Sequence, residues 1–368
     1  MAELIPGLPE EIAFECLMRL HYTTHRVASQ VCKRWRLILQ SKDFYYQRKQ
    51  GGFTHKAACL IQAVLGQTGS NQTKSAGPLK YGVSIFDSVS GSWDRIDPVP
   101  VYPDGLPLFC KVTSSEGKLV LLGGWDPVKY EPLSQVFVYE FTTRQWKRGK
   151  EMPENRSFFA AGELNGQIII SGGHDENKNA LKTAWVYDVT QDEWAELPQM
   201  SQERDECEGV VIGSEFWVVS GYRTDNQGGF EGSAESIEVG ASKWNRVDDA
   251  WKVTQEQCPR SSLGVGKDGH LFSWAESVSE VKVGTCGVQL GERTFLSGSG
   301  YEGGPHGFFL VNGQNGKWEK LEVADEFCGF VQSASNTCAT CSEHEQFLAG
   351  FLLLLKKTLG FPKLSVKS

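Results

Sequence analysis

Residues 109–125, FCKVTSSEGKLVLLGGW, recur twice further along the chain, as FFAAGELNGQIIISGGH at 158–174 and CEGVVIGSEFWVVSGY at 207–222. Each copy reads as a short apolar strand, a turn that contains glycine, and a strongly apolar strand that ends in Gly-Gly or Ser-Gly. Self-similarity at a period of about 50 residues is typical of repeat architectures, in which each unit buries its apolar face against a neighbour. The pattern predicts a β protein built from repeated sheets.

A second signal marks the end of each unit: an apolar residue is followed seven positions later by tryptophan. The pairs are Phe86 with Trp93, Tyr139 with Trp146, Tyr187 with Trp194, Ile237 with Trp244, and Val311 with Trp318. The interval between the last two tryptophans has room for one more unit, and LGVGKDGHLFSWAESVSEVKV (263–283) supplies its first two strands. We therefore predict six units, the fifth truncated, with these tryptophans filling the space between sheets.

Four strands per unit, with paired glycines closing the second strand, resemble the kelch repeat of β-propellers. We predict a mainly β fold, a six-bladed kelch β-propeller over residues 57–333 preceded by a small α-helical module. The first unit lacks a first strand, and FCGFVQS (327–333) reads like the first strands of the other units, so we expect it to close the ring and cover an otherwise exposed edge. The expected blades are 57–97, 108–148, 157–197, 206–247, 260–283 and 286–321, followed by a divergent or disordered tail at 334–368.

Residues 1–50 predict the helical module. Pro9 suits the first turn of a helix, and Glu10 and Glu11 complement its positive end. The module resembles an F-box in order and spacing, through Leu8-Pro9-Glu10-Glu11-Ile12, Cys16-Leu17-Met18-Arg19-Leu20, the segment from Val27 to Trp35, and Phe44. An unrelated helical cap on the following domain is the alternative.

The F-box resemblance implies binding to a Skp-type adaptor and, through it, to a cullin. The residues that this resemblance assigns to the adaptor interface are Leu8, Pro9, Ile12, Cys16, Leu17, Leu20, Val31, Cys32 and Trp35. Some of them must pack the module's own core instead, and the sequence does not separate the two sets. Leu8 and Pro9 precede the helix and are the better candidates for contact.

The loops on one side of the propeller carry the candidate client-binding residues. The segments PENRSFF, QERDECE and CPRSSLG place Arg156, Arg204 and Arg260 at what read as equivalent positions, where kelch adaptors of ubiquitin ligases present arginines to acidic clients. The alternative is that they pair with neighbouring Glu154, Glu203 or Asp205. The loops between second and third strands add Trp125, His174, Tyr222, Arg223 and Tyr301, residue types that binding hot spots favour.

Composition excludes several other classes of function. The net charge of −8 argues against nucleic acid or an acidic membrane as a partner. The longest apolar run, Phe347 to Leu355, is too short to span a bilayer, and the N-terminus lacks the pattern of a secretory signal. The 10 cysteines have no framework of close spacings and are expected in a reducing compartment, the cytoplasm or nucleus.

Catalytic and metal-binding signals are weak. No G-x-S-x-G, Walker or H-E-x-x-H motif occurs, so we expect no enzyme and no cofactor. Cys338 and Cys341 with His344 fall short of the four ligands of a structural zinc site, so no metal is expected.

These features are similar to plant kelch-repeat F-box proteins, which implies a non-catalytic substrate receptor of a Skp-cullin-F-box ubiquitin ligase. The resemblance extends to a group that directs the turnover of phenylalanine ammonia-lyase or of type-B response regulators, which implies such a protein as the client. A kelch scaffold acting outside a ligase and a propeller that senses a small molecule stay open as alternatives. Adaptor binding without ubiquitination of a client would favour the first, and ligand-dependent stabilisation the second.

Overall fold

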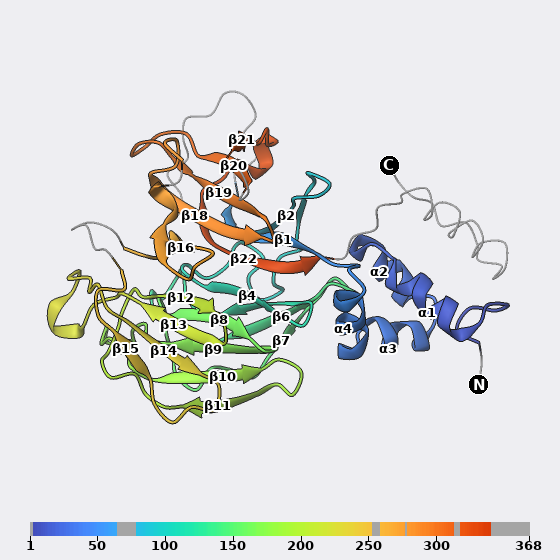
Figure 1. The fold of residues 1–368 in the computed structure, drawn as a ribbon, viewed down its shortest axis with the longest axis horizontal. Coiled ribbons are helices and arrows are strands. Elements are labelled where there is room, and N and C mark those ends of the chain that lie inside the picture. Colours follow the sequence, from blue (N-terminus) through green and yellow to red (C-terminus); the bar gives the residue numbers. More distant parts are fainter. Residues whose placement is uncertain (1–2, 65–78, 252–257, 277, 313–316, 340–368) are drawn as a thin grey trace. The chain divides into compact units, whose positions relative to one another are not determined.

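A computed structural model describes residues 3–64, 79–251, 258–276, 278–312 and 317–339 (Figure 1). The chain forms two compact units, one of which is built mainly from Met1–His55 and the other from Lys56–Glu140 and Arg144–Thr337. The tail expected at 334–368 begins as strand, since β22 extends to Ala339, and residues 340–368 lie outside the described residues.

The first unit is helical and consists of α1 (Glu10–Met18), α2 (Tyr22–Ser29), α3 (Lys33–Leu39) and α4 (Lys42–Gln50). Ser41 caps α4, its hydroxyl accepting from the backbone N–H of Phe44 at 3.2 Å. The apolar core of this unit includes Leu17, Trp35 and Phe44, each at most 2 % exposed.

The second unit is a propeller of antiparallel sheets. Its first sheet runs in the order β22 (Val331–Ala339), β1 (His55–Ala63), β2 (Tyr81–Asp87), β3 (Trp93–Arg95). The next three sheets follow the chain and consist of β4 (Lys111–Ser115), β5 (Lys118–Leu122), β6 (Val136–Glu140), β7 (Gln145–Arg148); β8 (Ala160–Leu164), β9 (Gln167–Ser171), β10 (Ala184–Asp188), β11 (Glu193–Leu197); and β12 (Glu208–Ile212), β13 (Glu215–Val219), β14 (Ala234–Glu238), β15 (Asn245–Val247).

The remaining sheets differ in size. One contains only β16 (Leu263–Val265) and β17 (Leu271–Ser273), and the other has four strands, β18 (Val283–Leu290), β19 (Arg293–Ser299), β20 (Gly307–Asn312) and β21 (Trp318–Lys320). The described residues thus form five complete blades rather than the six predicted, and the truncated unit is a two-stranded sheet. After β17 the chain forms a 3-10 turn at Trp274–Glu276 and reaches β18 within a few residues, which leaves no length for another hairpin. Further 3-10 turns lie at Thr224–Asn226 and Asp325–Phe327.

The inner strands form a closed ring. β4, β8, β12, β16 and β18 contact one another in that order. β22 joins the two ends, because Ser114 on β4 donates to the Asn336 carbonyl at 2.6 Å and the Asn336 amide donates to the Gln289 carbonyl on β18 at 3.2 Å. A C-terminal strand does lie beside β1, but it begins at Val331 rather than 327, since Asp325–Phe327 form a 3-10 turn.

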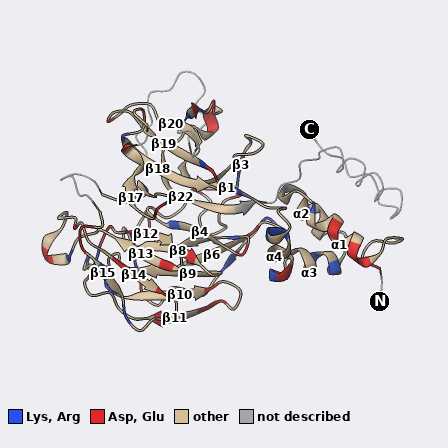
Figure 2. Cartoon of the chain, viewed as in Figure 1, with Lys and Arg blue, Asp and Glu red and all other residues tan. Residues whose placement is uncertain are grey.

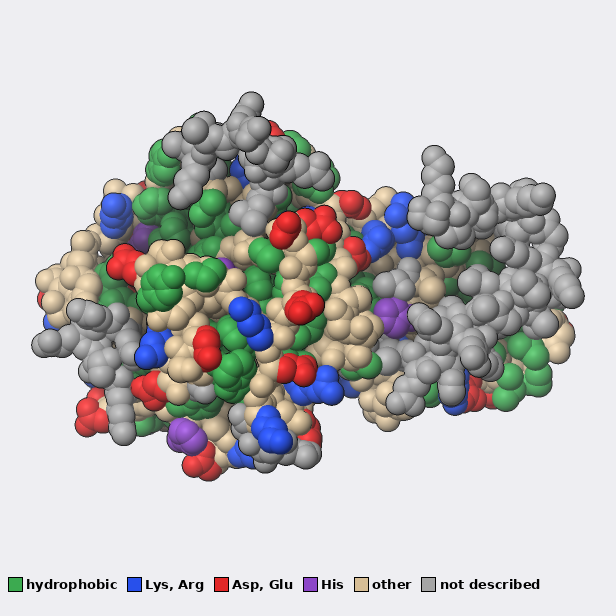
Figure 3. All heavy atoms as spheres, turned by 90° about the horizontal axis from the view of Figure 1, so that it is seen from above, with side chains coloured by type: hydrophobic (Ala, Val, Ile, Leu, Met, Phe, Trp, Pro, Cys, Tyr) green, Lys and Arg blue, Asp and Glu red, His purple; other side chains and the backbone are tan. Residues whose placement is uncertain are grey.

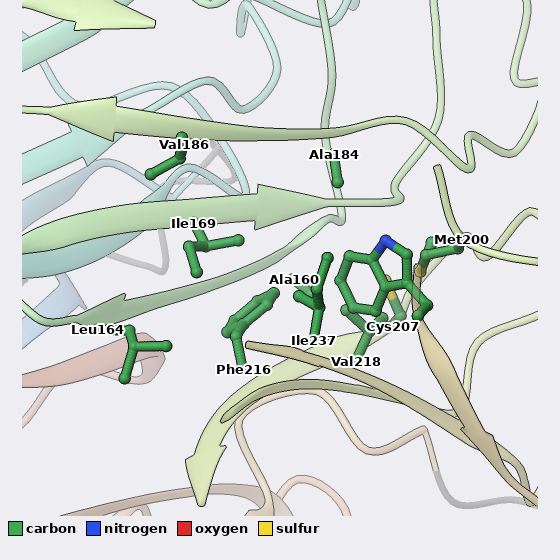
Figure 4. Packing of buried hydrophobic residues seen from close by; sticks show 11 residues of the cluster. Ala160, Leu164, Ile169, Ala184, Val186, Met200, Cys207, Phe216, Val218 and Ile237 are labelled. Carbon is green, nitrogen blue, oxygen red and sulfur yellow. The ribbon is translucent and has the colours of Figure 1, made fainter. Parts of the chain in front are cut away.

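Neighbouring blades share an apolar core. Between the third and fourth blades, Ile169, Val186, Phe216 and Ile237 pack together with other buried side chains (Figure 4). By the scale of about 25 cal/mol per Å² of buried apolar surface, such interfaces are the main stabilising contribution of the propeller.

The tryptophans of the fourth strands tie each blade to the preceding one. The indole N–H groups of Trp146, Trp194 and Trp244 donate to the carbonyls of Asp97, Lys150 and Pro198, at 2.7, 2.9 and 2.6 Å. Trp93 is half-buried against Phe327, whereas Trp318 is 43 % exposed. The expectation of a core position is wrong for Trp318, because the unit before it has no fourth strand to cover the ring.

Paired glycines end the second strands because a side chain there would strike an entering segment: that of the next blade at the first glycine, and that of the same blade at the second. Gly172 has φ +70°, and a Cβ on it would lie 2.6 Å from the Arg204 carbonyl oxygen. The left-handed conformation and the close backbone approach therefore both require glycine at this position.

Charges of both signs are interspersed along the chain (Figure 2), and on the face of Figure 3 neither sign forms a continuous field. None of the described helices is long and apolar enough to cross a membrane.

Candidate functional site

The helical unit divides the predicted adaptor-binding residues into core and surface. Leu17, Leu20 and Trp35 are buried, with 0, 6 and 2 % exposure, and the Trp35 indole donates to the Leu4 carbonyl at 2.8 Å. These three side chains hold the helices together and are not available to a partner. Leu8, Cys16 and Val31 are half-buried against the same core.

Pro9, Ile12 and Cys32 are exposed, Ile12 by 48 %. Val27 and Leu37, which were not among the predicted adaptor-binding residues, are also exposed, by 47 and 60 %. These exposed apolar side chains are available for contact with a partner protein. The Cys32 sulfur also caps α3, since it accepts from the backbone N–H of Trp35 at 3.4 Å.

A buried polar pair, also missed in the sequence, holds this unit together. Arg48 is 1 % exposed and donates to the carbonyls of Leu20 and Phe53, at 2.8 and 3.1 Å. Its guanidinium also lies 2.9 Å from Nε2 of His25, which is 5 % exposed. Burial, and after it the charge of Arg48, lowers the pKa of His25 to about 3, so the imidazole is neutral at physiological pH.

We call the side of the propeller on which the chain enters its first strands the mouth. Four of these strands, β4, β8, β12 and β16, are preceded by a residue in the left-handed conformation, with φ between 50° and 60°: Phe109, Phe158, Glu206 and Ser261. This shared conformation fixes the alignment of the entering segments. Arg156 and Arg204 lie two residues before the left-handed position, whereas Arg260 lies one residue before it. The three arginines are therefore not all equivalent, and a shift of one residue sends Arg260 in a different direction.

Arg156 and Arg204 are fully buried and bind their own blades. Arg156 donates to the Gly172 carbonyl at 3.1 Å, to the Thr183 hydroxyl at 2.9 Å and to Glu154 at 2.6 Å. Burial lowers its pKa to about 10, which leaves it charged at neutral pH.

Arg204 makes the corresponding bonds to the Ser220 carbonyl at 2.9 Å and the Ser233 hydroxyl at 2.9 Å, and it pairs with buried Glu235. Both guanidinium groups connect the second strand to the third, and neither is accessible to a binding partner, which contradicts the prediction of Arg156 and Arg204 as client-binding residues.

Arg260 is partly exposed and stacks on aromatic rings. Its guanidinium carbon lies 4.7 Å from the centre of the Phe158 ring and 5.5 Å from that of Phe109, and the two rings are 4.5 Å apart. Cation–π contacts of this kind fix the position of the guanidinium group and leave it positively charged. We call Phe109, Phe158 and Arg260 the central cluster. The two phenylalanines were not predicted as site residues from the sequence. The feature that could have revealed them is their recurrence at the same position before the first strand of successive blades.

Loop residues from successive blades surround the central cluster. The His174 ring lies 5.3 Å from that of Phe158 and 5.8 Å from that of Trp125. The Tyr222 hydroxyl donates to Glu206 at 3.3 Å, and Glu206 lies 3.8 Å from Arg260. Burial and then the charge of Asp205 raise the pKa of Tyr222, which keeps the hydroxyl protonated. The structure therefore brings Trp125, His174, Tyr222 and Arg260 into one network.

Within this network, Ser157, His174 and Asp205 are hydrogen bonded in the order of a hydrolase triad. The Ser157 hydroxyl lies 3.0 Å from His174 Nε2, and Asp205 lies 2.8 Å from Nδ1. Ser157 is 0 % exposed, however, so its hydroxyl cannot meet a substrate carbonyl in this conformation. The three residues instead join the entering segments of neighbouring blades, which contradicts the expectation of His174 as a surface binding residue.

Arg223 and Tyr301 are exposed, by 47 % at the Arg223 side chain and 66 % for Tyr301. Arg223 pairs loosely with Asp225 at 3.4 Å. The loop after β5 adds Val128 and Tyr130, 83 and 63 % exposed, which the sequence analysis missed because it named only Trp125 in this loop. Exposed aromatic and apolar side chains on loops held between rigid strands are suited to protein recognition.

Comparison with known proteins gives matches over both units. The F-box domain matches residues 5–47, and the kelch motif matches residues 108–153 and 155–201. F-box/kelch-repeat protein At1g15670 of Arabidopsis thaliana is 34% identical over 352 residues, covering 90% of this chain and 98% of the relative.

Two further matches cover less of the chain. F-box/kelch-repeat protein At1g80440 of the same plant is 40% identical over 249 residues, covering 67% of this chain and 70% of the relative. A solved structure described as the structure of YjhT aligns with 64% of this chain and 70% of its own, at 13% identity and a TM-score of 0.36.

Proposed function

Because the chain belongs to the plant family of F-box/kelch-repeat proteins, we propose that it is the substrate-recognition subunit of a Skp-cullin-F-box ubiquitin ligase. Its helical unit would bind a Skp-type adaptor and its propeller a client protein. The chain would do no chemistry itself. By holding the client near the ubiquitin carrier, the complex would make ubiquitin transfer effectively intramolecular, and this proximity would supply a large part of the rate enhancement.

The observation that carries this proposal is the exposed apolar surface of the F-box. Pro9 and the half-exposed Ile12 lie at the start of α1, and Leu8 lies half-buried beside them. A folded unit with a complete core of its own gains nothing from exposing these side chains, whereas an adaptor that covers them would bury apolar surface. Such anchors contribute on the order of 2 kcal/mol each to binding.

For the client we propose the mouth of the propeller. The central cluster would offer a charged guanidinium on an aromatic platform, and Trp125, Tyr130, Arg223 and Tyr301 would extend the contact. Arg260 and Arg223 favour a carboxylate-bearing segment of the client. By resemblance we propose a phenylalanine ammonia-lyase or a type-B response regulator as the client. The cysteine pattern and net charge favour a complex that works in the cytoplasm or nucleus without nucleic acid or membrane, and the sequence motifs favour one without a cofactor.

Affinity purification of the tagged full chain, with the proteasome inhibited, tests both halves. Pro9→Ala with Ile12→Ala should reduce the recovered adaptor at least tenfold and leave clients in place. Arg223→Ala with Arg260→Ala should do the reverse. Val89→Ala, an exposed apolar residue of the propeller, and Arg148→Ala, an exposed arginine, are the matched controls.

Adaptor recovery that is unchanged in the Pro9 and Ile12 variant would show the F-box assignment to be wrong. Clients retained by the Arg223 and Arg260 variant would show that the mouth is not their binding surface. An alanine variant of Arg156 or Arg204 would be uninformative, because both support the fold.

A further inference from the structure

The sheet formed by β16 and β17 has an unpaired outer edge. All other sheets among the described residues have four strands. In those sheets the second strand has a hydrogen-bonded neighbour on each side, and β17 corresponds to this second strand. Its partner β16 covers one side only. An uncovered strand edge presents free N–H and C=O groups and is a template for another strand.

The hydrogen bonds identify the groups at this edge. Trp274 donates to the Ser262 carbonyl at 2.7 Å and Gly266 donates to the His270 carbonyl at 2.8 Å, so alternate residues of β17 face β16. In an antiparallel pair, the residues between these positions direct their backbone N–H and C=O groups away from the partner strand. In β17 these residues are Leu271 and Ser273. We find no partner for their backbone groups within the described residues, although Ser273 is only 4 % exposed.

A cavity of about 560 Å³ lies along this edge, between β17 and the fourth blade. Its walls include Trp217, Trp251 and Phe272. The indole N–H groups of Trp217 and Trp251 have no hydrogen-bond acceptor in the part of the chain that is described, and Trp251 is 4 % exposed. Buried N–H groups without acceptors are costly, so the two indoles mark this part of the propeller as one where buried polar groups are left unsatisfied.

We call the place of the missing third and fourth strands of this unit the gap. The next blade, on the other side of the gap, also lacks a contact that the complete blades make. Trp146, Trp194 and Trp244 each bond to a carbonyl at the end of the preceding blade, but Trp318 has no such carbonyl before it and is 43 % exposed. Side chains of both neighbouring blades are therefore left without the contacts that two outer strands of this unit would provide.

The charge of the cavity lining favours a segment with basic ends. Asp249 and Glu276 are exposed and line it, and no Lys or Arg is among the described lining residues. We propose that this gap binds an extended segment of a partner protein, with apolar side chains at alternate positions and Lys or Arg at its ends. The segment adds to β17 as a third strand, by β-strand addition, at a surface separate from the propeller mouth.

A labelled peptide of that character, acetyl-KVTVTVK-amide, tests the proposal on the full chain by fluorescence anisotropy. Binding in the micromolar range should weaken at least tenfold in two variants. Ser273→Pro removes an N–H that makes no bond to β16, and proline is tolerated at strand edges. Asp249→Lys with Glu276→Lys reverses the charge, and Asp225→Lys, a 72 % exposed side chain elsewhere, is the control that should bind normally.

Two further measurements complete the test. The charge-inverted peptide acetyl-EVTVTVE-amide should bind the charge-reversed variant better than the wild type. Hydrogen exchange of the Leu271 and Ser273 amides should slow at least tenfold when the first peptide binds. The proposal is overturned if the peptide does not bind, if the Asp225 control loses binding equally, or if bound peptide leaves exchange at β17 unchanged. Occupation of the edge by a second copy of the chain, seen as a dimer by ultracentrifugation, would also overturn it.

Discussion

Replacing Arg204 by alanine should destabilise the propeller far more than replacing Arg156, although both are buried arginines at the same position of successive blades. The difference lies in the counter-ion. Glu235, the partner of Arg204, has a fully buried side chain, whereas the Glu154 side chain is 35 % exposed. Arg204→Ala leaves a buried carboxylate uncompensated, which costs about 3–5 kcal/mol. Arg156→Ala loses hydrogen bonds but leaves a hydrated carboxylate, which costs about 1–3 kcal/mol.

Urea unfolding of the full chain, followed by far-ultraviolet circular dichroism, measures both costs. The double variant Arg204→Met with Glu235→Gln should recover at least half of the loss, because it removes both charges. The side-chain amide that replaces the carboxylate can still accept from the Ser201 N–H, which now bonds Glu235 at 2.7 Å. Losses that agree within about 0.5 kcal/mol for the two alanine variants would refute this reasoning, as would a double variant no more stable than Arg204→Ala.

Three other outcomes follow from the described contacts. The pKa of His25 is lowered to about 3, so the F-box should lose stability as pH falls from about 6.5 towards 3, at up to about 1.4 kcal/mol per pH unit, and His25→Gln should flatten this dependence in hydrogen exchange of α1. Gly172→Ala should lower the free energy of unfolding by at least about 2 kcal/mol more than Gly213→Ala, where φ is also positive but nothing lies within 4 Å of the added Cβ; equal urea midpoints would contradict this. A chain ending at Glu326 lacks β22 and should aggregate on size-exclusion chromatography; a monomer that unfolds cooperatively would contradict the closure.

The repeat made the propeller predictable, because the spacing of apolar strands, glycines and tryptophans follows directly from blades that pack on identical neighbours. Trp194 and Gly172 have the expected roles for that reason. The number of complete blades was less predictable. The spacing of the tryptophans indicated that the unit around β17 has only its first two strands, and the structure shows that this unit is a two-stranded sheet and does not count as a complete blade.

Side-chain direction limited the prediction of the sites. The spacing along the chain placed Arg260 with Arg156 and Arg204, while the left-handed residue after it shows a shift of one position, which moves the guanidinium from the blade interior to the mouth. In the F-box, Leu17 and Ile12 both belong to the apolar pattern of one helix, and only packing of the other helices shows which of them is covered. Nothing in the sequence indicated that Arg48 is buried, because a charged residue in a helix is normally exposed.

The bonds from Trp146, Trp194 and Trp244 to the preceding blades have a consequence for synthesis on the ribosome. Each indole reaches a carbonyl that was translated earlier, at Asp97, Lys150 or Pro198, so every new blade can dock as soon as it emerges. The first blade is the exception, because β1 receives its inner neighbour only when β22 has been made. The oldest strand of the propeller is thus the last to be covered, and the nascent chain has most need of a chaperone there.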